Sequence, residues 1–430
     1  MGNVVYLQKP PQIAHFLRVG HREHLLCEHI HAVGKLATKR LVFEAGNVAH
    51  QRELMSELRS AGAELVLDTS AAEQSVEGRY SGAASNAPWA FGDRALEPDD
   101  FQPQTNRSVI EPIARFAVAA GFRTVLAPAH YLGGNQVDWL DVDRRSCEAL
   151  RLALNREGGE SISIDYPLIL DNAQIKDGAF RTRITVALQS LPIDYLWVRI
   201  AGFGSDATGA GVDKVVRALH GLHEVGLPII VDQVGGMAAL ALGSFGVASG
   251  FSNGLKGKDR FSASGWLTPK PTGAGGNPRR IFISGLDRRV PVDEIRAVFA
   301  RSPTARSVFG CRDSSCCSGI DSMLNEPEAH RAVQQGRAIG GLSAIPESMR
   351  ADRFLGTYLG DVQRDAARAL RLKTVSDDFR SMAQKASKRI DRMVDTLEQT
   401  SERLGVIEFA PEATFRTNRS ESPPGSRENP

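Results

Sequence analysis

Residues 39–69 read KRLVFEAGNVAHQRELMSELRSAGAELVLDT, and this stretch decides the fold. Two short apolar runs, KRLVFEA (39–45) and AELVLDT (63–69), flank HQRELMSELRSAG (50–62), whose apolar residues recur at helical spacing. Gly62 stands where a helix commonly ends. A strand, a helix and a second strand in this order predict a parallel βα unit whose helix covers the outside of the sheet.

The same alternation continues to about residue 286. Further strands are expected at 123–129, 161–170, 194–202, 227–233, 245–251 and 279–285. Together with 39–45 and 63–69 they make the eight strands that close a barrel. The predicted fold class is therefore α/β, a (β/α)8 TIM-like barrel with a Cys-rich zinc-binding insert and C-terminal helices. The polar, Gly/Ser/Pro-rich interval 70–107 is expected as a long loop on the face where barrel enzymes bind substrate.

The pattern divides the chain into five parts, because the strand–helix alternation stops after residue 286 and a polar tail follows the last helical run. These parts are an N-terminal segment (1–38), the barrel (39–308), a Cys3His zinc-like segment (309–335), C-terminal helices (336–408) and a disordered tail (409–430). We expect the C-terminal helices to pack on the barrel or to mediate homo-oligomerisation.

The net charge and the cysteine content restrict the classes of function that the chain could have. The 430 residues carry 52 Lys and Arg against 50 Asp and Glu, a formal charge of +2, which does not demand a nucleic-acid partner but allows a local basic groove. No secretory signal and no apolar run of membrane-spanning length are apparent, so no membrane partner is expected. Three of the five cysteines cluster, which favours reduced thiols or metal ligation and a cytoplasmic location.

The sharpest local motif is FGCRDSSCCSGIDSMLNEPEAH (309–330). It brings Cys311, Cys316, Cys317 and His330 within twenty residues. Three thiolates and one imidazole suit a tetrahedral Zn²⁺ ion, and four protein ligands leave no position for a reactive water. The motif predicts a structural zinc site; the alternative is a group of buried or incidental thiols in a loop.

Polar residues follow the predicted strands where a barrel places its active-site mouth. They are Glu44, Asp68, His130, Asp165, Arg199 and Asp232. A buried acid is costly unless it is paired or binds a ligand, so this ring predicts a site at the mouth. Alternatively, some of these residues form ion pairs inside the barrel, for instance Arg199 with Asp165 or Asp232.

Three Gly-rich loops follow the fifth to seventh predicted strands, at 201–211, 232–236 and 248–261. Glycine lets backbone N–H groups approach a planar base or a phosphate, so Gly202, Gly204 and Gly235 are candidate ligand contacts. Lys256 lies in the last loop, near Lys258, and is the candidate contact for an anionic substrate.

The order of these features resembles the tRNA-guanine transglycosylase superfamily, zinc-containing barrels that exchange a guanine base in nucleic acid for a 7-deazaguanine. Asp68-Thr69-Ser70 is similar in place to the family's base-binding Asp-Ser-Gly, Asp165 to its middle-strand acid, and Gly202 to Gly204 to its Gly-Gly loop. QVGGMAALALGSFGVASGF (233–251) is similar to its Gly-Val-Gly turn, helix and next strand.

The resemblance implies a zinc-binding transferase that binds or exchanges a purine or 7-deazaguanine base in tRNA or DNA. Where the family carries its nucleophilic Asp, this chain has Ser249, Phe251 and Ser252. The catalytic candidates are therefore Asp68 and Asp232, with Asp232 as a displaced nucleophile or general base. Asp165, Arg199 and Lys256 would then be substrate contacts.

Two other function classes stay open at this point. One is a barrel enzyme acting on a small anionic or phosphorylated substrate held by the Gly-rich loops. The other is a non-catalytic barrel that binds nucleic acid or a protein partner, in which the missing family nucleophile reflects a lack of turnover.

Overall fold

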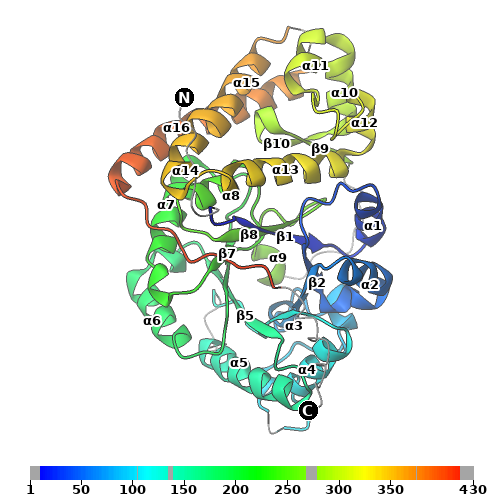
Figure 1. Ribbon diagram of the computed structural model, residues 1–430, viewed down its shortest axis with the longest axis vertical. Coiled ribbons are helices and arrows are strands. Elements are labelled where there is room, and N and C mark those ends of the chain that lie inside the picture. Colours follow the sequence, from blue (N-terminus) through cyan, green and yellow to red (C-terminus); the bar gives the residue numbers. More distant parts are fainter. Residues whose placement is uncertain (1–9, 104, 134–138, 268–277, 374, 417–430) are drawn as a thin grey trace, which may run out of the picture.

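The computed structural model describes residues 10–103, 105–133, 139–267, 278–373 and 375–416. Its centre is a closed barrel of eight parallel strands, in which each strand pairs with the next and β8 pairs with β1 (Figure 1). The strands are β1 (Ala14–Val19), β2 (Arg40–Glu44), β3 (Glu64–Asp68), β4 (Thr124–Leu126), β5 (Ser163–Asp171), β6 (Leu196–Ala201), β7 (Ile229–Val231) and β8 (Gly250–Gly254). The predicted fold class, a (β/α)8 barrel with a Cys-containing segment and C-terminal helices, is confirmed.

Helices surround the barrel and follow its strands. They are α1 (His24–Ala32), α2 (Arg52–Ser60), α3 (Ala71–Gln74), α4 (Ile110–Ala119), α5 (Trp139–Arg156), α6 (Gly178–Leu188), α7 (Gly209–His220), α8 (Gly236–Ser244) and α9 (Ser264–Leu267). Shorter 3₁₀ turns are η1 (Ala45–His50), η2 (Gly82–Asn86), η3 (Pro98–Phe101), η4 (Gln174–Lys176), η5 (His223–Val225) and η6 (Ser284–Leu286). The interval 70–107 contains only α3, η2 and η3, so it is a long loop as expected.

Helix α2 shows how the local pattern sets an element. Leu54, Met55 and Leu58 lie on one face of it and are buried against the barrel. The helix ends before Gly62, whose φ of 76° is a left-handed conformation that glycine adopts without steric cost. The predicted helix at 50–62 is confirmed, although the observed helix is about one turn shorter, because it begins at Arg52 and ends at Ser60.

Alternation along the strands builds the barrel interior in layers. Since successive side chains of a strand point to opposite faces, Phe16 and Arg18 share the interior face of β1, and Val66 and Asp68 share that of β3. The apolar layer consists of Phe16, Val42, Val66, Leu126, Trp197 and Ile230. Charged side chains lie two residues further on, at the carboxyl ends of the strands, which form the mouth.

Two strand assignments from the sequence are wrong. The first barrel strand is β1, inside the stretch 1–38 that we expected to be a separate segment. The predicted strand at 279–285 instead forms β9 (Arg280–Ile283), which pairs with β10 (Arg288–Pro291) in an antiparallel hairpin outside the barrel. The eighth barrel strand is β8, which overlaps the end of the expected strand 245–251.

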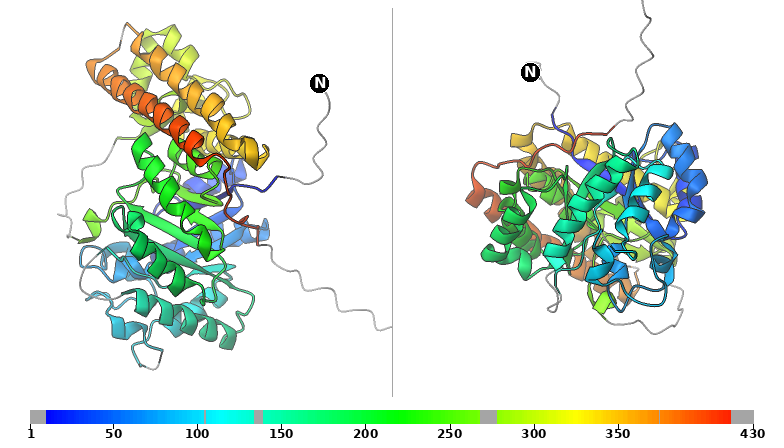
Figure 2. Two further views of the ribbon diagram at one scale, coloured as in Figure 1. Left: turned by 90° about the vertical axis from the view of Figure 1, so that its left-hand side faces the viewer. Right: turned by 90° about the horizontal axis from the view of Figure 1, so that it is seen from below.

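A helical part is attached to one side of the barrel and contains the hairpin (Figures 1 and 2). Its helices are α10 (Val292–Arg301), α11 (Pro303–Phe309), α12 (Ile320–Asn325), α13 (Pro327–Ser343), α14 (Glu347–Arg353), the π-helix η7 (Phe354–Leu359), α15 (Gly360–Leu370) and α16 (Asp377–Leu404). A second, smaller core lies between the hairpin, α10 to α12, and parts of α15 and α16; it includes Cys316 and Cys317.

The chain then returns to the barrel. After α16, residues 405–416 run in extended form along the barrel, where Ala410 N donates to Gly246 O at 2.8 Å (Figure 1). Residues 409–416, expected as the start of a disordered tail, belong to this extended segment, and 417–430 lie outside the described residues. Across the part of the chain described, no helix combines the length and the apolar character needed to cross a bilayer.

Candidate active site and metal centre

Four charged side chains form a closed network at the mouth end of the barrel interior. Arg18 donates from Nη1 to Asp68 Oδ2 and from Nε and Nη2 to both oxygens of Asp232, each at 2.7 Å. Arg199 donates from Nε to Asp232 Oδ2 at 2.8 Å and reaches Asp68 Oδ2 at 3.3 Å. Asp68, Arg199 and Asp232, predicted as site residues, are therefore brought together, whereas Arg18 was not predicted.

This network fixes Asp232 as a buried anion. Burial alone would raise the pKa of Asp232, but the charges of Arg18 and Arg199 outweigh it and hold the pKa well below its usual range. Ser252 Oγ also donates to Oδ1. Both carboxylate oxygens are thus occupied, and the alternative of an internal Arg199–Asp232 ion pair is confirmed.

Glu73 is, besides Arg18, a mouth residue that the sequence did not predict. It lies on α3, directly after β3, and lines a cavity of about 360 Å³ together with Glu44 and Ser70. Burial, and then the negative charges of Glu44 and Asp68, raise the pKa of Glu73 to about 7. The signal was present in the sequence as an acid closely following Asp68, in DTSAAE (68–73).

Glu44 differs from Glu73 in its surroundings. Lys258 Nζ binds Glu44 Oε1, and Asn47 Nδ2 donates to Oε2 at 3.1 Å. Glu73 has no hydrogen bond or ion pair of this kind among the described residues. The two carboxyl groups of one cavity therefore differ in their partners, since Glu44 is paired with a cation and Glu73 has a pKa raised to about 7.

Backbone conformation at the mouth is unusual. Ser70, Gln233 and Lys258 have φ of 56°, 56° and 53°, the left-handed region that side chains other than glycine seldom adopt. They lie in the loops after β3, β7 and β8 respectively. Such conformations cost free energy and gather at ligand sites, so their position after three barrel strands marks this face as functional.

Aromatic side chains cover part of the mouth. Tyr131, Phe261 and Trp266 pack together, with Phe261 and Trp266 ring centroids 4.8 Å apart. The Arg199 guanidinium lies 5.8 Å from the Phe261 ring and 5.9 Å from the Trp266 ring. Tyr131 Oη donates to Asp171 Oδ1 at 2.5 Å. The mouth therefore combines charged groups with flat apolar faces.

The expectation that Asp165 lines the mouth is wrong. Asp165 lies at the opposite end of the barrel, where Arg416 Nη2 donates to Oδ1 at 2.7 Å and Trp197 Nε1 donates to Oδ2 at 2.9 Å. Arg416 also contacts Thr124 and Glu64, the first residues of β4 and β3. Because Asp68 and Asp165 face different ends, they do not hold one ligand together.

His130 also points away from the mouth. Its Nδ1 lies 2.5 Å from Asp143 Oδ1, and its ring stacks on Trp139 of α5 with centroids 3.8 Å apart. The imidazole is buried between the barrel and this helix.

The predicted glycine contacts are packing positions. A Cβ on Gly204 would meet Arg260 Cα at 2.5 Å and Asp259 O at 2.6 Å, and a Cβ on Gly235 would lie 3.2 Å from Asp259 Cβ. Gly204 and Gly235 thus let the loops after β6 and β7 approach the loop after β8, whereas Gly202, with a φ of 79° and open space at its Cβ position, serves the backbone conformation. None of these three glycines is among the described lining residues of the cavity that contains Glu73.

Lys256 is likewise displaced from the mouth. Its side chain is exposed and lines a separate groove beside the β9–β10 hairpin, whereas Lys258 turns inward to Glu44. The loop after β8 therefore sends its two lysines to two different places.

The four predicted metal ligands converge. Cys316 Sγ and Cys317 Sγ each lie 3.4 Å from His330 Nδ1 and 3.6 Å from each other. Cys311 Sγ completes the set, in which all ligand atoms lie within 4.8 Å of one another. A zinc ion with Zn–S bonds of about 2.3 Å would hold its sulfur ligands about 3.8 Å apart, so the spacing fits a tetrahedral ion. The group could bind a metal ion.

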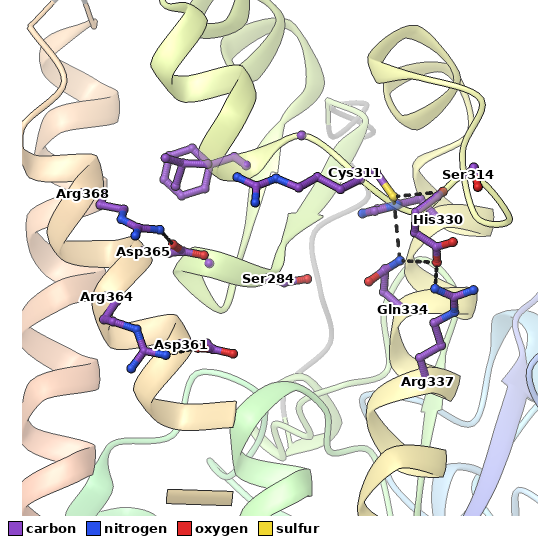
Figure 3. Close-up of a pocket in the computed structure, with 16 residues that line it drawn as sticks. Ser284, Cys311, Ser314, His330, Gln334, Arg337, Asp361, Arg364, Asp365 and Arg368 are labelled. Atoms are coloured by element: carbon purple, nitrogen blue, oxygen red, sulfur yellow. Dashed lines mark hydrogen bonds and ion pairs between the residues drawn. The ribbon is translucent and has the colours of Figure 1, made fainter. Parts of the chain in front are cut away.

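Cys311 is the ligand nearest the surface. It lines a cavity of about 730 Å³ between the Cys3His group and α15 (Figure 3). Gln334 Nε2 donates to Cys311 Sγ at 3.8 Å and to Asp313 Oδ2 at 3.4 Å. Arginines around this cavity are paired with acids, namely Arg337 with Asp313, Arg364 with Asp361 and Arg368 with Asp365. Gln334 thus orients Cys311 from outside the Cys3His group.

Comparison with known proteins assigns the chain to no family. No family model and no curated protein matches the chain. Among solved structures, type I 3-dehydroquinate dehydratase from Clostridium difficile is 11% identical with a TM-score of 0.35, over 60% of this chain and 90% of that one. KGPDC from Streptococcus mutans is 14% identical with a TM-score of 0.33, over 60% and 94%.

The carboxyl transferase domain of Rhizobium etli pyruvate carboxylase is 13% identical with a TM-score of 0.36, over 92% of this chain and 61% of that one. These likenesses assign no family, and the resemblance to the tRNA-guanine transglycosylases stays a prediction. By its own strand order the chain is a (β/α)8-barrel protein with an appended helical part and a Cys3His group that could bind a metal.

Proposed function

We propose that the protein is an enzyme that cleaves or exchanges a glycosidic bond at the barrel mouth by acid–base chemistry. The observation that carries the proposal is the pair Glu73 and Glu44, two carboxyl groups lining one cavity, of which Glu73 has a pKa raised to about 7 and Glu44 is paired with Lys258. A protonated carboxyl beside an ionised carboxylate is the set of groups that glycosidic bond cleavage uses.

Each group has a defined task in such a reaction. Glu73 donates its proton to the leaving oxygen or nitrogen as the bond to the sugar carbon breaks and its electron pair passes to the leaving atom. The Glu44 carboxylate stabilises the positive charge that develops on the sugar. Water, or the incoming base in an exchange, then forms the new bond to the sugar carbon and returns a proton to the Glu73 carboxylate. Arg18 and Arg199 hold Asp68 and Asp232 in place. These two acids therefore contribute to the shape and the electrostatic field of the mouth.

Charge balance favours a neutral substrate. Arg18, Arg199 and Lys258 face Asp68, Asp232 and Glu44, and a protonated Glu73 adds no charge. Arg79 and Glu77, which also line the cavity, add one charge of each sign. The described mouth residues therefore carry no net positive charge for the anionic substrate considered as an alternative from the sequence. A hydroxyl-rich sugar next to the Phe261 and Trp266 rings satisfies both the polar and the apolar groups.

Exchange of a purine or 7-deazaguanine base in tRNA or DNA is the narrower form of this proposal. It is supported by the order of sequence features and by the glycosidic chemistry open to Glu73. The role of Asp232 as nucleophile or general base is not supported, because both of its oxygens accept hydrogen bonds from Arg18, Arg199 and Ser252.

The experiment compares the wild type with Glu73→Gln on a panel of nitrophenyl glycosides and nucleosides, together with incorporation of labelled guanine into tRNA and DNA. Glu53→Gln, an exposed acid on α2, is the matched control. We expect Glu73→Gln to lower kcat/KM by at least about 100-fold, the usual contribution of a general acid. Wild-type activity should fall as the pH rises through about 7, because the acid must be protonated.

Full activity of Glu73→Gln with an unchanged pH profile would overturn the assignment of Glu73. No turnover of any panel member by the wild type would count against glycosidic chemistry. Guanine incorporation lost in Glu73→Gln and kept in Glu53→Gln would support the base-exchange form.

We further propose that the Cys3His group holds one structural Zn²⁺ ion. Support comes from the donor set and from S–N and S–S spacings of 3.4 and 3.6 Å, close to those around a tetrahedral zinc ion. Elemental analysis of untagged protein should give one zinc per chain. Cys316→Ser/Cys317→Ser should lose it, and Cys27→Ala/Cys147→Ala, which changes two buried cysteines outside the group, should retain it. Folded wild type without metal would refute the site.

A further inference from the structure

A second groove lies beside the mouth, on the other side of the loop that follows β8. Its volume is about 710 Å³, and it is bounded by that loop, by the β9–β10 hairpin and by the first turns of α13. It does not share a described lining residue with the cavity that contains Glu73. The groove is therefore a separate candidate site at the junction of the barrel and the helical part.

Positive charge dominates this groove. Its cationic lining residues are Lys256, Arg279, Arg280, Arg289 and Arg331, against the carboxylates of Asp259 and Glu328. Five cations against two acids leave an excess of three positive charges within one concave surface. A chain with a net charge of only +2 thus concentrates positive charge in this groove.

Both acids of the groove, Glu328 and Asp259, are already paired with arginines. Arg279 Nη2 and Nε bind both oxygens of Glu328, at 2.6 and 3.2 Å. Asp259 Oδ2 lies 3.0 Å from Arg331 Nη2 and 3.3 Å from Arg289 Nε, so one carboxylate serves two guanidinium groups. Within the described chain, Lys256 and Arg280 have no acidic partner. These two side chains are the cations available to a ligand.

Arg289 supplies an independent sign of an incomplete site. Its Nη1 donates to Lys256 O, and its Nε lies 3.3 Å from Asp259 Oδ2 without the alignment of a hydrogen bond. Its Nη2 is buried and has no hydrogen-bond partner in the described structure. A buried donor without a partner is costly, and most such donors in native proteins are satisfied by protein, water or ligand. An oxyanion in the groove would provide the missing acceptors.

The hairpin presents these groups by strand alternation. Ile281 and Ile283 of β9 point into the smaller core, so Arg280 and Phe282 face the groove. Arg289 of β10 is the register partner of Phe282 and lies on the same face. The Arg331 guanidinium lies 5.7 Å from the Phe282 ring. Arginine and an aromatic ring on one face suit phosphate oxygens and an attached base.

We propose that this groove binds the phosphate groups of a nucleotide or a nucleic-acid strand. Guanidinium groups match phosphate oxygens in geometry and charge, and Lys256 adds a mobile cation at the rim. Lys256 and Lys258 lie two residues apart on one loop and reach the groove and the mouth respectively. A strand in the groove would place its next nucleotide near the mouth, but phosphate binding itself is independent of the proposed glycosidic chemistry.

The test measures binding by fluorescence anisotropy of labelled 20-nucleotide single-stranded RNA and DNA, with inorganic phosphate and AMP as unlabelled competitors. We compare the wild type with Lys256→Gln/Arg280→Gln, which removes two exposed cations without breaking an ion pair. The control, Lys214→Gln/Lys388→Gln, makes the same change of charge at exposed residues of α7 and α16, which do not line the groove.

We expect the groove variant to weaken binding at least tenfold and the control to leave it within twofold. The slope of log K against log salt should decrease by about 1.4 in the groove variant, since each phosphate contact on a single strand contributes about 0.7. Displacement by AMP or phosphate at submillimolar concentration would identify a small phosphorylated ligand. Displacement only by unlabelled strand would identify nucleic acid.

Equal loss in the groove and control variants would overturn the proposal, as would the absence of binding by every probe. Glu73→Gln should bind the strand as well as the wild type. Failure of the glycosidic proposal therefore leaves this result unchanged, and the two proposals are tested separately.

Discussion

Asp232 shows at the residue scale how partners decide the role of a side chain. Its position after β7 in a barrel suggested a nucleophile or base, but two guanidinium groups and a hydroxyl occupy its oxygens. Glu73, three residues beyond the left-handed backbone of Ser70, has no such cation bound to it and keeps a raised pKa. Within the same mouth, neighbouring cations lower the pKa of the buried Asp232, whereas burial beside anions raises the pKa of Glu73.

Asp232→Asn should therefore act first on stability. The amide places an NH2 group or a neutral oxygen against Arg18 and Arg199, leaving buried positive charge that Asp68 alone does not balance. We expect a loss of about 3 to 5 kcal/mol in the free energy of unfolding, the usual cost of breaking a buried pair. Asp206→Asn, which removes the exposed pair with Arg260, should cost less than about 1 kcal/mol. Equal urea midpoints for the two variants would contradict this account of the network.

At the element scale, local pattern predicted some strands and missed others for a physical reason. The strands RLVFE and ELVLD are mostly apolar, whereas β1 reads AHFLRV, and its histidine and arginine look unlike a barrel strand. Arg18 is tolerated inside because Asp68 and Asp232 meet it from strands 50 and 214 residues away in sequence. Such long-range compensation leaves no signal in a local window. For the same reason, the sequence did not predict the pairing of Asp165 with Arg416.

The extended segment 405–416 covers the end of the barrel opposite the mouth. Arg416 binds Asp165 and Glu64 and stacks 3.7 Å from the Tyr195 ring centroid, and Tyr195 Oη donates to Thr414 O at 2.5 Å. Burial raises the pKa of both Asp165 and Glu64, and Arg416 opposes the shift in each. The segment thus compensates two acids that close the barrel floor.

We expect Arg416→Ala to lower stability by about 3 to 5 kcal/mol at pH 7, because it leaves those acids buried with Arg40 as their remaining cation. Without Arg416 their folded-state pKa values rise further above the unfolded values, so the folded state binds protons more tightly. Stability lost by the variant should then grow as the pH rises above about 4 and shrink in acid. Urea unfolding at pH 5 and pH 8 tests this. A pH-independent loss would show that Arg416 acts by packing alone.

At the scale of the whole molecule, the sequence predicted the barrel and the convergence of the Cys3His residues but not their placement in separate cores. The alternation of apolar runs and helices is a local pattern repeated along the chain, which is why the fold class followed from it. The motif at 309–330 is short enough for its spacing to restrict geometry. Which helices enclose it depends on α15 and α16, more than 30 residues away, and on tertiary packing that composition does not record.

The two cores predict a graded response to metal removal. Cys316 and Cys317 pack in the smaller core with Ile281, Phe299 and Phe379, whereas the helices α8, α13 and part of α16 belong to the larger barrel core. If the Cys3His group binds zinc, removal of the ion leaves three thiols and an imidazole close together with no ion between them. Binding energy of structural zinc is folding energy, so the smaller core should open before the barrel does.

Hydrogen–deuterium exchange with and without a strong chelator measures this directly. We expect chelation to raise exchange of α10 to α12 and of the hairpin by at least tenfold, while β1 to β8 stay protected. Cys316→Ser/Cys317→Ser should show the same pattern without chelator. Loss of protection throughout the barrel would mean that the two cores unfold as one cooperative unit. No change anywhere would mean that the packing of the smaller core holds the Cys3His group without metal, because apolar burial around Phe299 and Phe379 would then be sufficient to stabilise it.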